Sequence, residues 1–165
     1  QAETRELIQQ IRAKIPDIAI RTTMLVGFPG ETEEDFQDMC DFVEEMEFER
    51  LGVFQYSHED DTAAHQLEDD IDTDTKEERA SRLMQIQQEI SFRKNEDKVE
   101  KVFKVLVDRK EGGYFIGRTE YDSPEVDNEV LIDAKKNFCR IGDFCNVKIY
   151  DATDFDLYGE VVNGQ

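Results

Sequence analysis

The chain has 165 residues, of which 40 are Asp or Glu and 20 are Lys or Arg, so its formal net charge is −20 at pH 7. This charge argues against a non-specific nucleic-acid binder, which needs a basic surface, and favours a basic protein partner such as a ribosomal protein. No apolar run approaches the roughly 18 residues of a membrane-spanning helix. No signal-like segment opens the chain either, so we expect no membrane association.

The first 57 residues alternate between helical and strand patterns. They predict, in order, a helix ending at Pro16, a strand over Ile18–Val26, a turn at Gly27–Gly30, a helix with the capping-box pair Thr32 and Asp35, and a strand over Leu51–Ser57. The alternation is typical of a parallel sheet, and the first strand, whose apolar end does not alternate, is expected to be buried on both faces. Two strands cannot complete such a sheet, so we expect unpaired edges or bare apolar faces and interpret residues 1–74 as part of a larger unit.

The second half of the chain changes its pattern. Residues 58–78 are rich in acids and predict a solvated loop, and a long helix follows over residues 75–98. Five short strands then predict a small antiparallel barrel of OB-like size over residues 99–165. These strands are Val102–Val107, Gly113–Thr119, Glu129–Asp133, Cys145–Tyr150 and Leu157–Val162. The predicted fold class is therefore α/β plus all-β.

The three cysteines, Cys40, Cys139 and Cys145, form no CxxC or CxxxCxxC pattern. Their odd number does not fit a disulfide framework, so we expect a reducing, cytoplasmic location. We expect no iron–sulfur or zinc site formed by this chain alone. His58 and His65 lack companions at metal-ligand spacing and are interpreted as surface residues.

The sharpest local pattern is Thr23–Phe36, where a predicted strand ends and a helix begins. Parallel sheets and barrels bind ligands on that side, and the glycines there let a ligand approach the backbone. The stretch lacks the Gly-Lys-Ser/Thr of a P-loop, so an ordinary turn stays the alternative. Ser57, His58 and Glu59 are consecutive and point apart, so they form no catalytic relay, and no catalytic residue is assigned.

Three stretches together resemble the radical S-adenosylmethionine (SAM) methylthiotransferase family: Arg21–Phe36, Gly52–Ala64 and Gly117–Asp127. The first two resemble the later strand–helix unit and the following strand of the radical SAM barrel. The third resembles the carboxyl-terminal TRAM domain. The resemblance covers nearly the whole chain. It implies the carboxyl-terminal part of the barrel at 1–74, a connecting helix at 75–98 and a TRAM domain at 99–165.

The resemblance also implies a SAM site at the first turn. The implied SAM contacts are Arg21, Val26, Gly27, Pro29 and Gly30. Arg21 would reach the SAM carboxylate through a charge-assisted pair. In this family a SAM-derived radical abstracts a hydrogen atom from the substrate, and two 4Fe–4S clusters serve the reaction. The cysteines that would hold both clusters are absent from this sequence, so the chain is expected to be inactive alone.

Within the family, the stretch Asp122–Asp127 is similar to enzymes that methylthiolate the β-carbon of an aspartate in ribosomal protein twelve of the small subunit. The resemblance implies that the barrel docks this basic protein. The implied substrate contacts are Arg118, Tyr121, Asp122, Glu125 and Asp127. Residues 99–165 hold 14 acidic and 9 basic side chains, so we expect a ribosomal protein rather than RNA as the partner.

The sequence departs from the family pattern at Asp61 and Asn128, where glycine is usual, although Asn tolerates a positive φ. Two alternatives stay open. One is a segment of a tRNA methylthiotransferase (MiaB-like), which a basic stripe across the barrel would favour. The other is a non-enzymatic acidic module that captures basic proteins.

Overall fold

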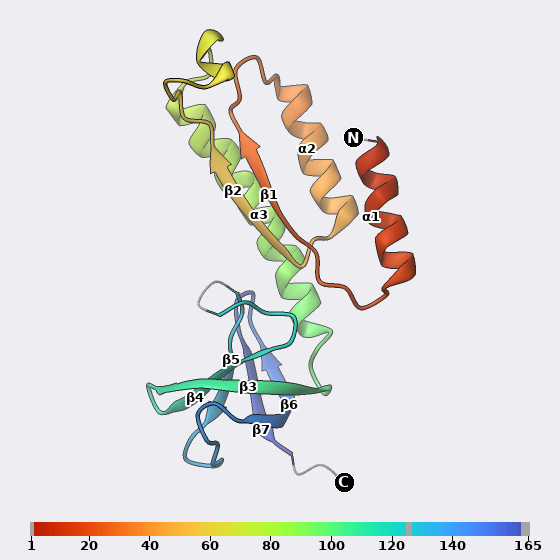
Figure 1. Ribbon diagram of the computed structural model, residues 1–165, viewed down its shortest axis with the longest axis vertical. Helices are drawn as coiled ribbons and strands as arrows, with labels where there is room; N and C mark the ends of the chain where they lie inside the picture. Colours follow the sequence, from red (N-terminus) through yellow and green to blue (C-terminus); the bar gives the residue numbers. More distant parts are fainter. Residues whose placement is uncertain (1, 125–126, 163–165) are drawn as a thin grey trace. The chain divides into compact units, whose positions relative to one another are not determined.

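The computed structural model describes residues 2–124 and 127–162, which form two compact units divided between Ile90 and Ser91 (Figure 1). The first unit contains α1 (Ala2–Lys14), β1 (Arg21–Val26), α2 (Glu33–Met46), β2 (Arg50–Gln55), the 3₁₀ helix η1 (Ala63–Gln66) and most of α3 (Thr73–Glu96). The second contains β3 (Val102–Glu111), β4 (Tyr114–Thr119), β5 (Val130–Asp133), β6 (Phe144–Ala152) and β7 (Leu157–Val161). Every predicted helix and strand is present, and the predicted fold class is confirmed.

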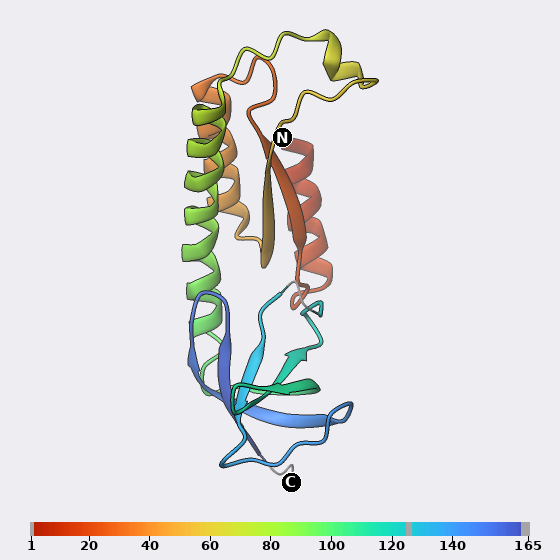
Figure 2. The same ribbon diagram turned by 90° about the vertical axis from the view of Figure 1, so that its left-hand side faces the viewer.

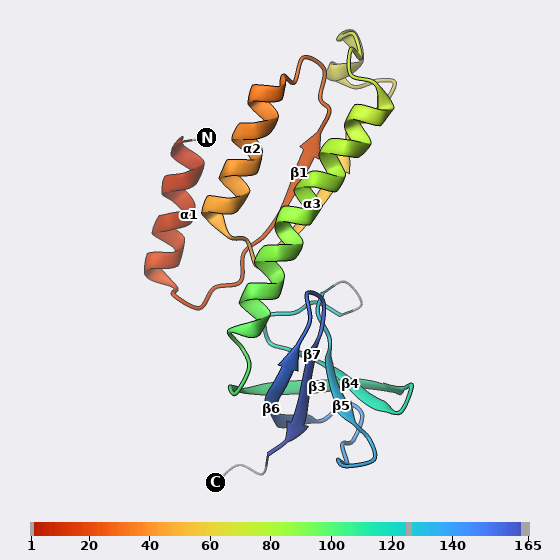
Figure 3. The ribbon, with the colours of Figure 1, turned by 180° about the vertical axis from the view of Figure 1, so that it is seen from behind.

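In the first unit, β1 and β2 form a two-stranded parallel sheet. Helices α2 and α3 lie on one face of this sheet (Figures 2 and 3). Buried apolar side chains from the strands and helices meet there: Val26, Phe36, Val43, Phe48 and Leu83. On the opposite face, Leu25 is 44% exposed and Phe54 is 63% exposed. Within the described chain β1 is therefore buried on one face rather than both, and the expectation of bare apolar surface is met.

Helix α2 begins with the predicted capping box. The Thr32 hydroxyl accepts a hydrogen bond from the Asp35 amide at 3.1 Å, and the Asp35 carboxylate accepts one from the Thr32 amide at 3.0 Å. The Thr32 hydroxyl also lies 2.6 Å from the Asp35 carboxylate, and this hydrogen bond, followed by the one from the Thr32 amide, lowers the pKa of Asp35. The capping box therefore fixes where the turn after β1 ends and the helix starts.

The second unit is a closed barrel with the strand order β3-β4-β5-β7-β6. Four pairings are antiparallel, but β5 and β7 pair in parallel, so the expectation of a wholly antiparallel barrel was wrong. The reason is geometric, because an odd number of strands cannot alternate in direction all the way around a ring. The barrel interior is filled mainly by β-branched side chains, including Val105, Val107, Val130, Ile132 and Val147.

The end of α3 belongs to the second unit. The Ser91 hydroxyl donates to the carbonyl oxygen of Asp154 at 2.8 Å, and the Asn95 amide donates to that of Thr153 at 2.9 Å. Asn95 is fully buried. Side-chain contacts thus group the last turns of α3 with the barrel. The domain boundaries predicted from the sequence, 1–74, 75–98 and 99–165, stay a prediction.

Two positions depart from the family's usual glycine. Asp61 has a φ of 62°, which places an acidic residue in the left-handed region. Asn128 is not among the described non-glycine residues with positive φ, so its backbone needs no glycine-like conformation.

No helix in the described part of the chain combines the length and apolar character needed to cross a membrane.

Candidate ligand-binding sites

The turn between β1 and α2 brings together four of the predicted SAM contacts: Val26, Gly27, Pro29 and Gly30. Val26 is fully buried, and both glycines have positive φ, 72° and 82°. The Gly27 amide donates to the two carboxylate oxygens of Glu31 at 3.1 and 3.2 Å, and the Gly30 amide donates to the Asp70 carboxylate at 2.8 Å. The amides of both glycines are therefore already occupied by side chains of this chain.

The two glycines differ in the space beside them. A Cβ atom on Gly27 would lie 2.4 Å from Cγ of Lys76, a residue of α3 that is 6% exposed. The Lys76 ammonium bonds the Asp69 carboxylate at 2.7 and 2.8 Å. At Gly30 no atom lies within 4 Å of the corresponding position. Gly27 therefore makes room for the Lys76 side chain of α3, whereas the space beside Gly30 is open.

An aromatic side chain stands in the same turn. Phe28 is 40% exposed, and its ring packs edge-on against Tyr56 with the centroids 5.3 Å apart. The turn thus presents a partly exposed aromatic ring at Phe28 beside the open position of Gly30.

Arg21 does not lie at this turn. It is the first residue of β1, on the exposed face of the sheet, and Val26 is the last. They are five positions apart along an extended strand, a separation of about 16 Å. The structure therefore brings the four turn residues together and leaves Arg21 at the opposite end of the strand.

The described residues contain no group of three His, Cys, Asp or Glu side chains placed to hold a metal ion. Cys40 is buried in the core of the first unit. Burial, with Cys139 nearby, raises the pKa of Cys145 to about 12, so this thiol stays protonated. His58 and His65 are exposed, as expected, with ring centroids 4.5 Å apart.

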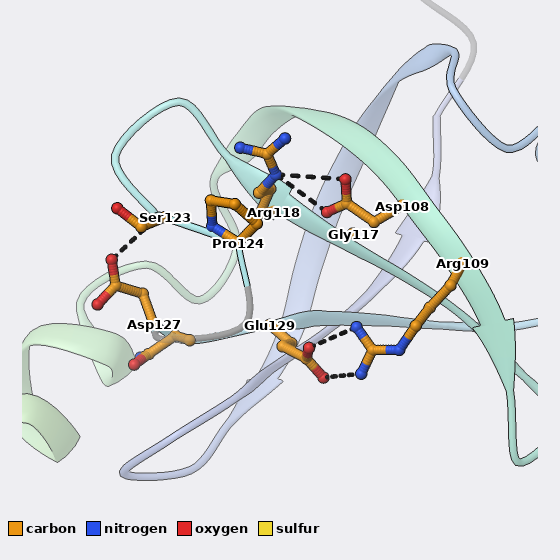
Figure 4. Close-up of a pocket in the computed structure, with 9 residues that line it drawn as sticks. Asp108, Arg109, Gly117, Arg118, Ser123, Pro124, Asp127 and Glu129 are labelled. Carbon is orange, nitrogen blue, oxygen red and sulfur yellow. Dashed lines mark hydrogen bonds and ion pairs between the residues drawn. The ribbon is translucent and has the colours of Figure 1, made fainter.

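The second candidate site is a pocket of about 360 Å³ in the barrel unit (Figure 4). It lies between β3, β4 and the segment that leads into β5. The lining residues are Asp108, Arg109, Gly117, Arg118, Ser123, Pro124, Asp127, Asn128 and Glu129. Of the predicted substrate contacts, the pocket therefore brings together Arg118 and Asp127.

The other predicted substrate contacts are placed differently. Tyr121 is 40% exposed but does not line the pocket, and Glu125 lies outside the described residues. Asp122 is only 6% exposed, and its carboxylate accepts the Thr119 hydroxyl at 2.6 Å. Asp122 is thus held inside its own loop rather than on an open acidic face.

Two ion pairs form walls of the pocket. Arg109 bonds Glu129 with two parallel contacts of 2.7 and 3.0 Å, and Nε of Arg118 bonds Asp108 at 3.0 and 3.3 Å (Figure 4). The hydrogen bonds to Glu129, followed by those to Glu111, raise the pKa of Arg109. The Arg109 guanidinium therefore remains charged beside its two carboxylates.

A basic and aromatic segment that was not predicted from the sequence follows β5. Lys135, Lys136 and Arg140 are exposed, and Phe138 is 88% exposed. Phe144, at the start of β6, is 62% exposed and lies beneath the ammonium of Lys104 at 4.5 Å. The close spacing of these residues in the sequence is the signal that could have predicted the segment. The negative net charge of the whole barrel argued against a basic surface there.

Known proteins resemble the chain along nearly its whole length. Residues 99–162 match the TRAM domain family. Three relatives, each named ribosomal protein uS12 methylthiotransferase RimO, come from Cytophaga hutchinsonii, Flavobacterium johnsoniae and Bacteroides thetaiotaomicron. They are 59%, 55% and 49% identical to the chain over 97–98% of its length. The chain spans 37% of the length of each relative. The chain is therefore similar along almost its whole length to the corresponding part of these RimO proteins.

Proposed function

We propose that this chain is part of a radical SAM methylthiotransferase that adds a methylthio group to the β-carbon of an aspartate in ribosomal protein twelve of the small subunit. The observation that carries the proposal is 59% identity, over 97% of the chain, to a relative named for methylthiotransferase activity on this ribosomal protein. The remainder of the enzyme would lie in sequence outside this chain. The three free cysteines support a cytoplasmic location.

SAM would bind at the turn after β1. Open space at Gly30 and the exposed ring of Phe28 support an adenosine contact there, with Val26, Gly27 and Pro29 fixing the shape of the turn. When bound, SAM would supply the radical precursor and the methyl group, and two 4Fe–4S clusters would be held by cysteines outside this chain. A contact between Arg21 and the SAM carboxylate stays a prediction, because Arg21 stands at the far end of β1.

The barrel would dock the ribosomal protein. Arg118 and Asp127 in the pocket, with the half-exposed Tyr121 nearby in sequence, are the proposed contacts. Long-range attraction between the acidic chain and a basic substrate would raise the association rate. Glu125 belongs to the same proposed surface but lies outside the described residues.

One observation favours a second candidate, the tRNA methylthiotransferase. Exposed aromatic rings beside Lys and Arg side chains are typical of surfaces that stack and neutralise single-stranded RNA. Phe138 with Lys135, Lys136 and Arg140 provides such a combination after β5. Binding of the chain to a tRNA anticodon stem-loop, measured across a salt series, tests this candidate directly.

The main proposal is tested with a chimera. The homologous segment of the Cytophaga hutchinsonii relative is replaced by this chain, and the purified chimera is incubated with SAM, a reductant and the ribosomal protein. Mass spectrometry of the ribosomal protein should show one added methylthio group on an aspartate. The isolated chain under the same conditions should give none.

A matched pair of chimeras sharpens the test. Gly30→Leu places a side chain in the open space of the turn and should abolish modification, whereas Gly112→Leu, at another open glycine, in the β3–β4 turn, should leave it within about twofold. Methylthiolation of tRNA with no modification of the ribosomal protein would replace the main proposal with the second candidate.

A further inference from the structure

The side-chain amide of Asn128 is a buried hydrogen-bond donor without an acceptor among the described residues. Its side chain lines the pocket of the barrel unit, the residue is 8% exposed, and Nδ2 is buried with no hydrogen-bond partner among the described residues. Buried polar groups in folded proteins nearly always have a partner, because leaving one unpaired costs the full desolvation penalty. An unpartnered donor in the wall of a pocket indicates that a bound molecule supplies the acceptor.

The pocket is built by an irregularity in β3. The register between β3 and β4 shifts between Val107 and Arg109, which leaves Asp108 as an extra residue in the strand. Neighbouring strand residues ordinarily point to opposite faces, but a bulge re-aims side chains, and here Asp108 and Arg109 both line the pocket. Each is fixed by an ion pair, with Arg118 and Glu129 respectively. The walls are therefore preorganised around Asn128.

The chemistry of the lining favours a neutral acceptor. Asp108, Asp127 and Glu129 outnumber the two arginines, so the lining carries a formal charge of −1. Both guanidinium groups already bond carboxylates, so the pocket offers an anion no uncompensated positive charge. Figure 4 shows Nε of Arg118 bonded to Asp108, with its terminal nitrogens pointing away from that carboxylate.

We propose that this pocket binds a main-chain carbonyl of a basic peptide segment, with Nδ2 of Asn128 as the hydrogen-bond donor. The excess of carboxylates attracts a Lys or Arg side chain on the same segment, and the carbonyl satisfies the buried amide. The inference rests on the proposed function only for the owner of the segment, which would be the ribosomal protein.

The first test follows the pocket by NMR in the complete 165-residue chain. The probe is capped lysine, N-acetyl-lysine-N-methylamide, which supplies two carbonyls and one ammonium. We expect saturable shifts of the Asn128 side-chain amide and of the Gly117 backbone amide. Capped glutamate and inorganic phosphate should shift neither. Phosphate shifts without capped-lysine shifts, or no saturable shift with any probe, would overturn the inference.

A pair of variants separates the pocket from the general surface. Asn128→Ala should weaken capped-lysine binding at least tenfold, with Gly117 as the reporter, whereas Asn146→Ala, at an exposed asparagine on β6, should change it less than twofold. If Asn128→Ala does not fold, the NMR shift of the Asn128 side-chain amide in the unaltered chain still tests whether capped lysine binds in the pocket.

The ribosomal protein is then titrated against the same three chains. Equal affinity for wild type and Asn128→Ala would contradict the pocket inference and leave the proposed function intact. No binding of the ribosomal protein, together with saturable capped-lysine shifts at Asn128, would contradict the proposed partner and leave the pocket inference standing.

Discussion

Arg79 on α3 and Glu31 in the β1–α2 turn form a buried ion pair, with Nη1 and Oε1 2.7 Å apart and side chains only 9% and 7% exposed. The same carboxylate accepts the Gly27 amide, and Nη1 of Arg79 also donates to the Glu31 carbonyl oxygen at 3.2 Å. One arginine thus connects α3 to the turn that is proposed to hold SAM.

Removing this arginine should destabilise the first unit strongly. Arg79→Ala leaves the Glu31 carboxylate buried without its cation, a change that costs about 3–5 kcal/mol. Arg82→Ala is the matched control, because Arg82 is 45% exposed and pairs with the exposed Glu33, and it should cost less than about 1 kcal/mol. Urea unfolding measures both. Equal effects of the two variants would show that burial of the pair is unimportant.

The two glycines of the turn should respond differently to alanine. Gly27→Ala combines an unfavourable φ with a collision against Lys76 and should cost about 2–4 kcal/mol. Gly30→Ala meets only the φ penalty, about 1–2 kcal/mol, because the space beside it is open. Thermal unfolding of both variants checks the order, and a larger loss for Gly30→Ala would contradict the placement of Lys76.

Replacing Asp156 with asparagine should stabilise the barrel at neutral pH and have little effect in acid. Burial raises the pKa of Asp156, so folding disfavours its ionised form; this penalty is fully present above the folded-state pKa, shrinks as the pH falls through it and is gone below the unfolded-state pKa. Asn keeps the acceptor for the Glu129 amide, now at 3.2 Å from Oδ1. Asp156→Asn should therefore raise the Tm at pH 7, with the difference shrinking toward about pH 3.

The exposed Asp143 gives the control for this measurement. Asp143→Asn should leave the Tm nearly unchanged across the same pH range. A lower Tm for Asp156→Asn at pH 7 would mean that its carboxylate charge stabilises the fold.

Variants of Asp122 and Asp127, two aspartates of one loop, should differ in effect: one should lower stability and the other should slow binding. Asp122→Ala removes the buried acceptor of the Thr119 hydroxyl and should lower the free energy of unfolding by about 1–3 kcal/mol. Asp127→Asn should mainly slow association with the ribosomal protein, an effect that fades with salt because charges are screened over about 8–10 Å. Stopped-flow binding and urea unfolding measure the two effects. Slower association in Asp122→Ala but not in Asp127→Asn would reverse this assignment.

Local patterns were enough to predict the elements of this fold. The pair Thr32 and Asp35 predicted where α2 begins, because a capping box depends on residues three apart in sequence. The change to short apolar strands predicted the barrel. The parallel pairing of β5 with β7 was not predicted, because it depends on the order of strands around a closed ring rather than on any local pattern.

The sites were harder to predict than the elements. Asp122 looks like a surface acid in the sequence, yet its carboxylate turns inward to Thr119. Asn128 looks like a turn residue, but its importance arises from the bulge at Asp108, twenty residues earlier in the chain. Arg21 is close to the SAM turn in sequence, whereas extended strand geometry carries it to the other end of β1.

The strand order of the barrel has a consequence for how it is synthesised. β7 pairs with both β5 and β6, and it follows every other barrel strand in the chain. While a ribosome is still making β7, the nascent chain therefore has two unpaired strand edges and an open apolar interior. Closure depends on contacts that are distant in sequence, which form slowly, so this interval is when the barrel is most exposed to aggregation.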